Sequence, residues 1–253
     1  MEIIGHGFLA RHLTGIAAAH PGVVVLAAGV SAASGTPVAE FDREAALLER
    51  VIARCVASGE RLVFFSTAST GMYGAMGRGA EDEAVDPCTP YGHHKWRLER
   101  AVRDCGADYL IVRLAHVAGP DQPPHQLLPA LLAQVLGGDV RLRDGARRDI
   151  IDIVDVVAIL DRLLSAGING DVVNIATGWA IPVERIVDRI EANLPPGRAA
   201  ARRTLVATPP LNHLVSTDKL RRLVPETADM GFGAHYYEAV IDRYIPLSAE
   251  SLV

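Results

Sequence analysis

The chain has 253 residues, of which 49% are hydrophobic, and a formal net charge of −5 at pH 7. This length suits one large α/β domain or a domain with a smaller lobe, and the apolar content supplies a sizeable core. The negative charge and the scattered arginine pairs argue against a nucleic-acid partner, because nucleic-acid surfaces gather lysine and arginine into a stripe or patch.

The three cysteines are odd in number and have no C-x-x-C spacing, which indicates reduced thiols and neither a disulfide framework nor a zinc site. No metal is expected. The first residues lack the basic segment of a signal peptide, and the most apolar later run, residues 23–30, is too short to span a bilayer. We therefore expect a cytoplasmic protein with no membrane partner.

Short apolar runs alternate with amphipathic segments through the first half of the chain. The predicted strands are residues 2–5, 23–26, 61–66 and 109–114, and the predicted helices are residues 8–20, 40–58 and 90–105. This alternation is typical of a parallel, doubly wound α/β sheet. After Pro120 the pattern is less regular, and two proline-rich stretches, 120–129 and 195–210, bracket segments that we assign to a smaller lobe. Residues 171–175 read as a strand that returns to the main sheet.

A glycine-bearing turn, Gly5-His6-Gly7-Phe8-Leu9-Ala10, joins the first predicted strand to the first predicted helix. Such a turn lets a pyrophosphate approach backbone N–H groups at a helix N-terminus. The alternative is a turn that merely packs tightly. Arg11 follows and suits a 2′-phosphate, although an exposed helix arginine is the plainer interpretation.

Tyr91 and Lys95 are four residues apart in the predicted helix 90–105, so their side chains share one face. A free tyrosine has a pKa near 10, and a neighbouring ammonium favours the phenolate, so the two residues form a candidate acid/base pair. The alternative is an exposed aromatic residue beside a solvated lysine.

Taken together, the motifs resemble the extended short-chain dehydrogenase/reductases, the NAD-dependent epimerase/dehydratase family that acts on nucleotide sugars. The resemblance covers about residues 1–240 and rests on the glycine turn, the Tyr91/Lys95 pair and the segments 62–69, 112–120, 148–155 and 172–175. It implies a Rossmann-like cofactor domain of residues 1–120 plus about 150–177. A substrate-binding lobe of about 121–149 and 178–253 is interleaved with it.

The resemblance also implies roles for individual residues. Tyr91 would be the general acid/base, Lys95 would lower its pKa and hold the cofactor ribose, and Thr67 or Ser69 would polarise the reacting oxygen. NAD or NADP would be bound by Gly5, Gly7, Phe8, Leu9, Ala10, Arg11, Ala27, Ala28, Ser66 and Lys95. His116 would contact the sugar, and Arg148 would grip the diphosphate of a nucleotide-sugar substrate. For each of these last two the alternative is an ordinary loop or surface residue.

Two departures from the family pattern bear on function. The family's 4,6-dehydratases carry an Asp-Glu pair where this chain has Ala68 and Ser69, which favours simple hydride transfer over dehydration. The run at residues 23–31 resembles the family's fourth strand although it directly follows the first helix. The chain therefore reads as lacking the family's second and third strands, with no Asp or Glu between Glu2 and Glu40 for the adenosine ribose. We expect a weakly bound cofactor.

That shortening poses a question of topology. If the first helix keeps its usual face, its connection to residues 23–26 is left-handed, whereas about 98% of such crossovers are right-handed. Either the helix has changed face or the crossover is a rare exception. The helices 40–58 and 90–105 correspond to the pair that forms a four-helix dimer interface in many relatives, so we expect a homodimer, with Leu47, Leu48, Val51 and Cys55 covering that face.

The sequence therefore favours a nicotinamide-dependent oxidoreductase or epimerase that acts on a nucleotide-activated keto sugar. The alternative is a catalytically reduced member of the family that serves as a binding or regulatory module. The shortened first half motivates this alternative, and the intact Tyr91, Lys95 and Arg148 count against it.

Overall fold

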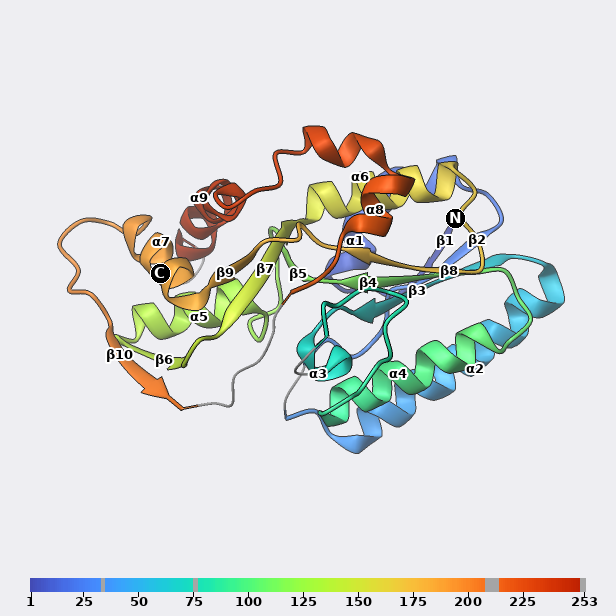
Figure 1. The fold of residues 1–253 in the computed structure, drawn as a ribbon, viewed down its shortest axis with the longest axis horizontal. Helices are drawn as coiled ribbons and strands as arrows, with labels where there is room; N and C mark the ends of the chain where they lie inside the picture. The colour runs from blue at the N-terminus through green and yellow to red at the C-terminus, as the bar shows by residue number, and fades with distance from the viewer. Residues whose placement is uncertain (33–34, 75–76, 208–213, 251–253) are drawn as a thin grey trace.

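The computed structural model describes residues 1–32, 35–74, 77–207 and 214–250. Its main sheet has five parallel strands in the order β1-β2-β3-β4-β8 (Figure 1). They are β1 (Glu2–Ile4), β2 (Val23–Leu26), β3 (Arg61–Thr67), β4 (Tyr109–Leu114) and β8 (Asp171–Ile175). The expected parallel α/β sheet is confirmed, and its strands begin and end within about one residue of the predicted bounds.

Helices cover both faces of this sheet, because successive strand side chains point to opposite faces. Val25, Val63 and Val112 pack with α1 (Phe8–Leu13), α6 (Ile153–Ser165) and α8 (Asp218–Leu223). Val24, Leu62 and Ile111 pack on the other face with α2 (Val38–Ser58) and α4 (Pro90–Arg103). Figure 1 shows α2 and α4 together on one side of the sheet and α6 and α8 on the opposite side. The strands therefore read as continuous apolar runs, as expected for a sheet buried on both faces.

The connection from β1 to β2 has the opposite hand to the two connections that follow it. Each of the three connections moves one strand along the sheet in the same direction, but α1 lies on the face opposite to α2 and α4. Since right-handed crossovers prevail, the unusual one is β1-α1-β2. Of the two alternatives, the rare exception is the one observed. In residues 1–32, only α1 and the 3₁₀-helix η1 (Thr14–Ala19) separate β1 from β2.

The remaining strands and helices form a smaller lobe. Its strands are β5 (His116–Ala118), β6 (Asp139–Arg143), β7 (Arg147–Asp152), β9 (Ala180–Pro182) and β10 (Arg202–Val206), in the orders β5-β7-β9 and β10-β6. They pack with α5 (Leu127–Leu136), α7 (Val183–Ala192) and α9 (Tyr236–Glu250) around a second apolar cluster. One boundary differs from the expected one: α8 and the 3₁₀-helix η2 (Pro225–Asp229) pack on the main sheet through Leu220 and Val224. Short α3 (Thr70–Tyr73) completes the elements.

The residues expected to cover a dimer face do not lie on a free surface. Leu48, Val51 and Cys55 are buried against the main sheet of the same chain, and Leu47 is half-buried beside them. The outer face of α4 instead carries exposed arginines such as Arg97 and Arg100. The expectation that these four residues cover a dimer face was therefore wrong, and the homodimer itself stays a prediction.

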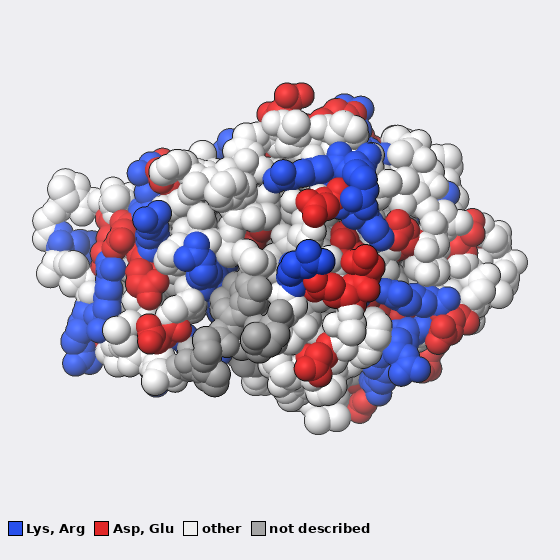
Figure 2. Space-filling view, in the orientation of Figure 1, with Lys and Arg blue, Asp and Glu red and all other residues white. Residues whose placement is uncertain are grey.

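Charges of both signs are interspersed on the face drawn in Figure 2. Among the described residues, no helix combines the length and apolarity needed to cross a bilayer.

Candidate active site

The first turn of α4 is fixed against the segment that follows β3. The side chain of Thr89 caps the helix, its Oγ1 accepting a hydrogen bond from the Gly92 N–H at 3.0 Å, and Pro90 stands in the first turn. A Cβ on Gly92 would lie 1.9 Å from the carbonyl oxygen of Gly71, so only glycine allows this contact. The close approach brings Tyr91, the residue just before Gly92, to the end of β3.

Tyr91, Lys95 and Thr67 lie close together at this point. The Lys95 ammonium lies 5.8 Å from the centre of the Tyr91 ring. Burial raises the pKa of Tyr91, while the Lys95 charge and a hydrogen bond with Thr67 oppose this shift and the Glu44 charge adds to it. The net direction is upward, which is opposite to the lowering expected from Lys95 alone. In this arrangement Tyr91 is a phenol at neutral pH.

The three candidate hydroxyls at the end of β3 differ in their surroundings. Ser66 is buried and points at the Met72 sulfur, 3.8 Å from its Oγ. Thr67 is also buried, and its Oγ1 accepts a hydrogen bond from the Ser69 N–H at 3.2 Å. The Ser69 Oγ is a buried atom with no hydrogen-bond partner in the part of the chain that the structure describes. Ser66 and Thr67 thus have partners within the chain, whereas the Ser69 hydroxyl has none among the described residues.

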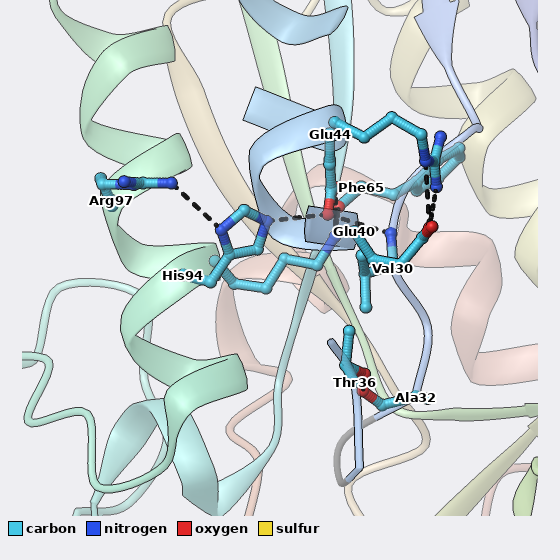
Figure 3. A network of polar contacts seen from close by, with 10 residues as sticks. Val30, Ala32, Thr36, Glu40, Glu44, Phe65, His94 and Arg97 are labelled. Atoms are coloured by element: carbon cyan, nitrogen blue, oxygen red, sulfur yellow. Dashed lines mark hydrogen bonds and ion pairs between the residues drawn. The ribbon is translucent and has the colours of Figure 1, made fainter. Parts of the chain in front are cut away.

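Lys95 is buried in an ion pair that the sequence did not predict. Its ammonium lies 2.7 Å from Oε1 of Glu44, and both side chains are almost fully buried. The other carboxylate oxygen of Glu44 accepts hydrogen bonds from Nε2 of His94 and from the Val30 N–H, both at 2.9 Å (Figure 3). Burial alone would raise the pKa of Glu44, but these three donors outweigh it and lower that pKa to about 2.

Glu44 contacts Lys95 and was not revealed by the motifs, although the sequence carries a signal for it. Glu44, Leu48, Val51 and Cys55 recur at helical spacing, and all four are buried. A carboxylate inside an apolar stripe is costly unless it is paired, so its position calls for a buried cation. The partner, Lys95, lies 51 residues away and cannot be found from local periodicity.

In the glycine turn, where we expect the cofactor pyrophosphate, the backbone of Gly5 packs closely against that of Ala27. Gly5 has φ +137°, and a Cβ there would lie 2.5 Å from the Ala27 carbonyl oxygen. Gly5, Ala27 and Ala28 are thus brought together at the ends of β1 and β2. Gly7 precedes α1 without any side-chain cap, and the side chains of Phe8 and Ala10 point into the core, so the turn offers backbone rather than side-chain groups.

The two predicted substrate residues lie on neighbouring strands of the sheet β5-β7-β9 in the smaller lobe. His116 of β5 and Arg148 of β7 are both half-buried, and β5 pairs in parallel with β7. The pKa of Arg148 is lowered, first by burial and then by the nearby charge of Arg143. Neither Arg143 nor Arg148 has a carboxylate partner within the described ranges. Two adjacent unpaired guanidinium groups are suited to bind a polyanion.

A family model agrees with this geometry: residues 10–176 match the NAD dependent epimerase/dehydratase family. The chain belongs to this family. Among curated relatives, the UDP-glucose 4-epimerase of Rhizobium meliloti (strain 1021) is 29% identical over 185 residues, which are 61% of this chain and 56% of the relative. The Agl12 low-salt glycan biosynthesis protein of Haloferax volcanii is 30% identical over 46% of this chain and 40% of its own length. The chain thus aligns with about half the length of these two relatives.

Solved structures support the same fold for this epimerase/dehydratase member. The dTDP-glucose 4,6-dehydratase of Bacillus anthracis in complex with NAD has a TM-score of 0.74 and 20% identity, covering 90% of this chain and 73% of that one. RMD from Pseudomonas aeruginosa complexed with NADPH also has a TM-score of 0.74, with 18% identity over 99% of this chain and 98% of that one. The expected family and Rossmann-like fold are confirmed, as is the nicotinamide class of the cofactor at the level of the family.

The geometry fits the nicotinamide and pyrophosphate parts of such a cofactor better than its adenosine part. Lys95 uses two of its three N–H bonds, toward Glu44 and the Phe65 carbonyl, so one remains for a ribose hydroxyl. The turn is tight at Gly5 but open at Gly7, where an added Cβ would meet no atom within 4 Å. By contrast, Glu2 is the only acid before Glu40, and it forms an ion pair with Arg54. Arg11 is exposed and donates to the Asp121 carbonyl oxygen at 3.1 Å.

Proposed function

We propose that this protein is a nicotinamide-dependent oxidoreductase or epimerase of a nucleotide-activated keto sugar. The observation that carries the proposal is the convergence of Tyr91, Thr67 and Lys95 where β3 meets α4. A phenol, a hydroxyl and an ammonium at one point are the groups needed to move a proton to or from a carbonyl or carbinol oxygen. Family membership and the two arginines on the smaller lobe support the same substrate class.

Each residue then has a defined task. Thr67 and Ser69 hydrogen-bond the reacting oxygen and hold it beside the Tyr91 hydroxyl. Tyr91 gives a proton to that oxygen during reduction or takes one from it during oxidation. Lys95 holds a ribose hydroxyl and adds positive charge, and Gly5 with Ala27 shapes the passage for the pyrophosphate. A bound nicotinamide supplies the hydride chemistry.

Arg148 and Arg143 bind the diphosphate of the substrate, and His116, on the strand next to Arg148, contacts the sugar. The arginines lie on β6 and β7 of the smaller lobe, whereas Thr67 ends β3 of the main sheet, so the substrate spans the two lobes with its sugar toward the main sheet. The absence of an Asp-Glu pair at Ala68 and Ser69 favours plain hydride transfer over loss of water.

The test is turnover of reduced nicotinamide in the presence of UDP- and dTDP-linked keto sugars, followed by absorbance. We expect oxidation of NADH or NADPH with at least one of these sugars and none with the free sugar. If no nucleotide sugar is reduced, oxidised or epimerised although it binds, the protein is a binding module. The observation that favours this second function is the lack of a free acidic residue ahead of α2 for the adenosine ribose.

A further inference from the structure

The proposed function leaves the buried carboxylate of Glu44 without a task. Glu44 is 1% exposed and Lys95 is 3% exposed, and their charged atoms are 2.7 Å apart. Burying such a pair is costly, because both ions lose their hydration, and well-packed apolar residues would often be as stable. The presence of the pair is therefore not explained by stability.

The site is built to hold this carboxylate in one place. His94 and Lys95 reach it from α4, and the Val30 N–H reaches it from the loop after β2. Gly29 passes directly over the pair: a Cβ there would lie 2.4 Å from Oε1 of Glu44 and 3.0 Å from Nζ of Lys95. The carboxylate thus ties α2, α4 and the loop that follows Ala27 and Ala28 to one another (Figure 3).

The ion pair of Glu44 and Lys95 changes the electrostatic field at the Tyr91 hydroxyl. An isolated Lys95 ammonium beside the ring would favour the phenolate, whereas an ammonium in contact with a carboxylate presents a nearly neutral dipole. The ionisable groups around Tyr91 are Lys95 and His94 on its own helix and Glu44 on α2. Strand β3 brings Phe64, Phe65 and Thr67, and the loop at Gly29 and Val30 brings backbone groups. The charges that act on Tyr91 are those of Lys95 and Glu44, which have opposite effects on it, and Arg97 reaches this group only through His94.

We propose that Glu44 is a positioning residue that neutralises the field of Lys95 and so keeps Tyr91 in its phenol form, ready to donate a proton to a carbonyl oxygen. This inference rests on the proposed function and narrows it to the reduction of a keto sugar. The carbonyl carbon receives a hydride from reduced nicotinamide, and the carbonyl oxygen takes the phenol proton of Tyr91. The products are a secondary alcohol, oxidised nicotinamide and a Tyr91 phenolate, which recovers its proton from water.

The test is a direct titration of Tyr91 in the protein without cofactor or substrate. Tyrosine labelled with ¹³C at Cζ reports ionisation by NMR, and Tyr91→Phe assigns the signal. Glu44→Gln should lower the pKa of Tyr91 by about one unit or more, a tenfold rise in its ionisation constant. Lys95→Met should raise that pKa, and the double variant should return it toward the wild-type value. Glu40→Gln, one turn earlier on α2 and exposed, is the matched control and should change nothing.

The Lys95→Met protein and the double variant keep the proposal testable if Glu44→Gln alone does not fold. In that case the Lys95→Met protein is compared with the double variant, and the added Glu44→Gln change must still lower the pKa of Tyr91. An unchanged titration in either comparison overturns the positioning role.

Turnover separates this inference from the proposed function. If the titration shifts as expected but no keto sugar is reduced, Glu44 keeps its role and the proposed function fails. If keto sugars are reduced but the titration does not shift, only the role of Glu44 fails. In active protein, Glu44→Gln should also move the high-pH limb of the reduction rate to lower pH, because a purely structural residue would change the rate without moving that limb.

Discussion

Gly92 of α4 and Gly71 of α3 touch so closely that a Cβ on Gly92 would lie 1.9 Å from the Gly71 carbonyl oxygen. The neighbouring Cys88 N–H donates to the same oxygen at 3.0 Å, so the start of α4 is held to the end of the β3 segment by backbone groups. Tyr91 lies between these two contacts in the chain. This glycine packing therefore helps to set its position relative to Thr67, together with the Thr89 cap and the hydrogen bond with Thr67.

Gly92→Ala tests this placement. The added methyl group cannot be accommodated without moving α4, so we expect a loss of ~1–3 kcal/mol in the free energy of unfolding, the range for overpacking. Turnover should fall by about 100-fold, since a misplacement of about 1 Å has such an effect on reacting groups. Urea denaturation and steady-state kinetics measure the two effects. His93→Ala, at the exposed neighbouring position, should leave both unchanged.

Tyr91→Phe tests the proton transfer itself. Removing only the hydroxyl should lower turnover by a factor of ~100 or more, the range for losing a general acid or base. The ring stays in place, so the melting temperature should hardly change. A Phe variant with near-normal turnover would remove Tyr91 from the mechanism.

The sequence predicted much of this fold for identifiable reasons. Strands such as Val23–Leu26 and Tyr109–Leu114 are apolar runs because both faces of the sheet are covered, so composition alone marked them. The Tyr91/Lys95 pair was visible because helical spacing puts residues four apart on one face. Each of these signals is local.

What the sequence did not predict depends on contacts between distant segments. Glu44 meets Lys95 across 51 residues, and Gly29 is needed only because it crosses over that pair. The face on which α1 packs follows from its contacts with α6, far along the chain, so the hand of the β1–β2 connection could not be settled locally. The upward pKa of Tyr91 was missed for the same reason, because burial and Glu44 are both tertiary effects.

Glu44 also predicts a pH dependence of stability. Its pKa is lowered from 4.5 to about 2 in the folded protein, so the folded state holds fewer protons than the unfolded state between these values. Stability from this group is fully present above about pH 5 and is lost as the pH falls through 2, amounting to ~3 kcal/mol. Glu44→Gln should lack this loss.

The comparison must be made as a difference between wild type and variant. Asp149, buried and hydrogen-bonded to Thr177, has a pKa raised to about 6, so its contribution has the opposite sign and falls as the pH rises from about 4 to 6. Asp149 is present in both proteins and cancels. Unfolding free energies in urea at several pH values between 3 and 7 supply the curves, and parallel curves would contradict a lowered pKa at Glu44.

Arg148→Ala tests the diphosphate site. The guanidinium has no carboxylate partner within the described ranges, so its loss should chiefly weaken substrate binding, by ~1.5–3 kcal/mol for a charge-assisted hydrogen bond. The effect should appear in KM for UDP- or dTDP-sugars more than in kcat. Arg202→Ala, an exposed arginine of the same lobe that pairs with Asp139, is the control. Equal affinity in the Arg148 variant would make Arg148 a surface residue.

The adenosine end of the cofactor site gives the last prediction. Strand β1 is an edge of the described sheet, and the only acid before Glu40 is Glu2, whose carboxylate is held by Arg54. With no free carboxylate for the adenosine ribose, we expect dissociation constants above about 10 µM for both NADH and NADPH, and a difference between them of less than about tenfold, or 1.4 kcal/mol. Calorimetric titration measures both values. Arg11→Ala should weaken NADPH more than NADH if Arg11 meets the 2′-phosphate, and should weaken neither if it only donates to Asp121. Tight binding with strong preference for NAD would contradict this account, because such selectivity requires a carboxylate that these residues do not provide.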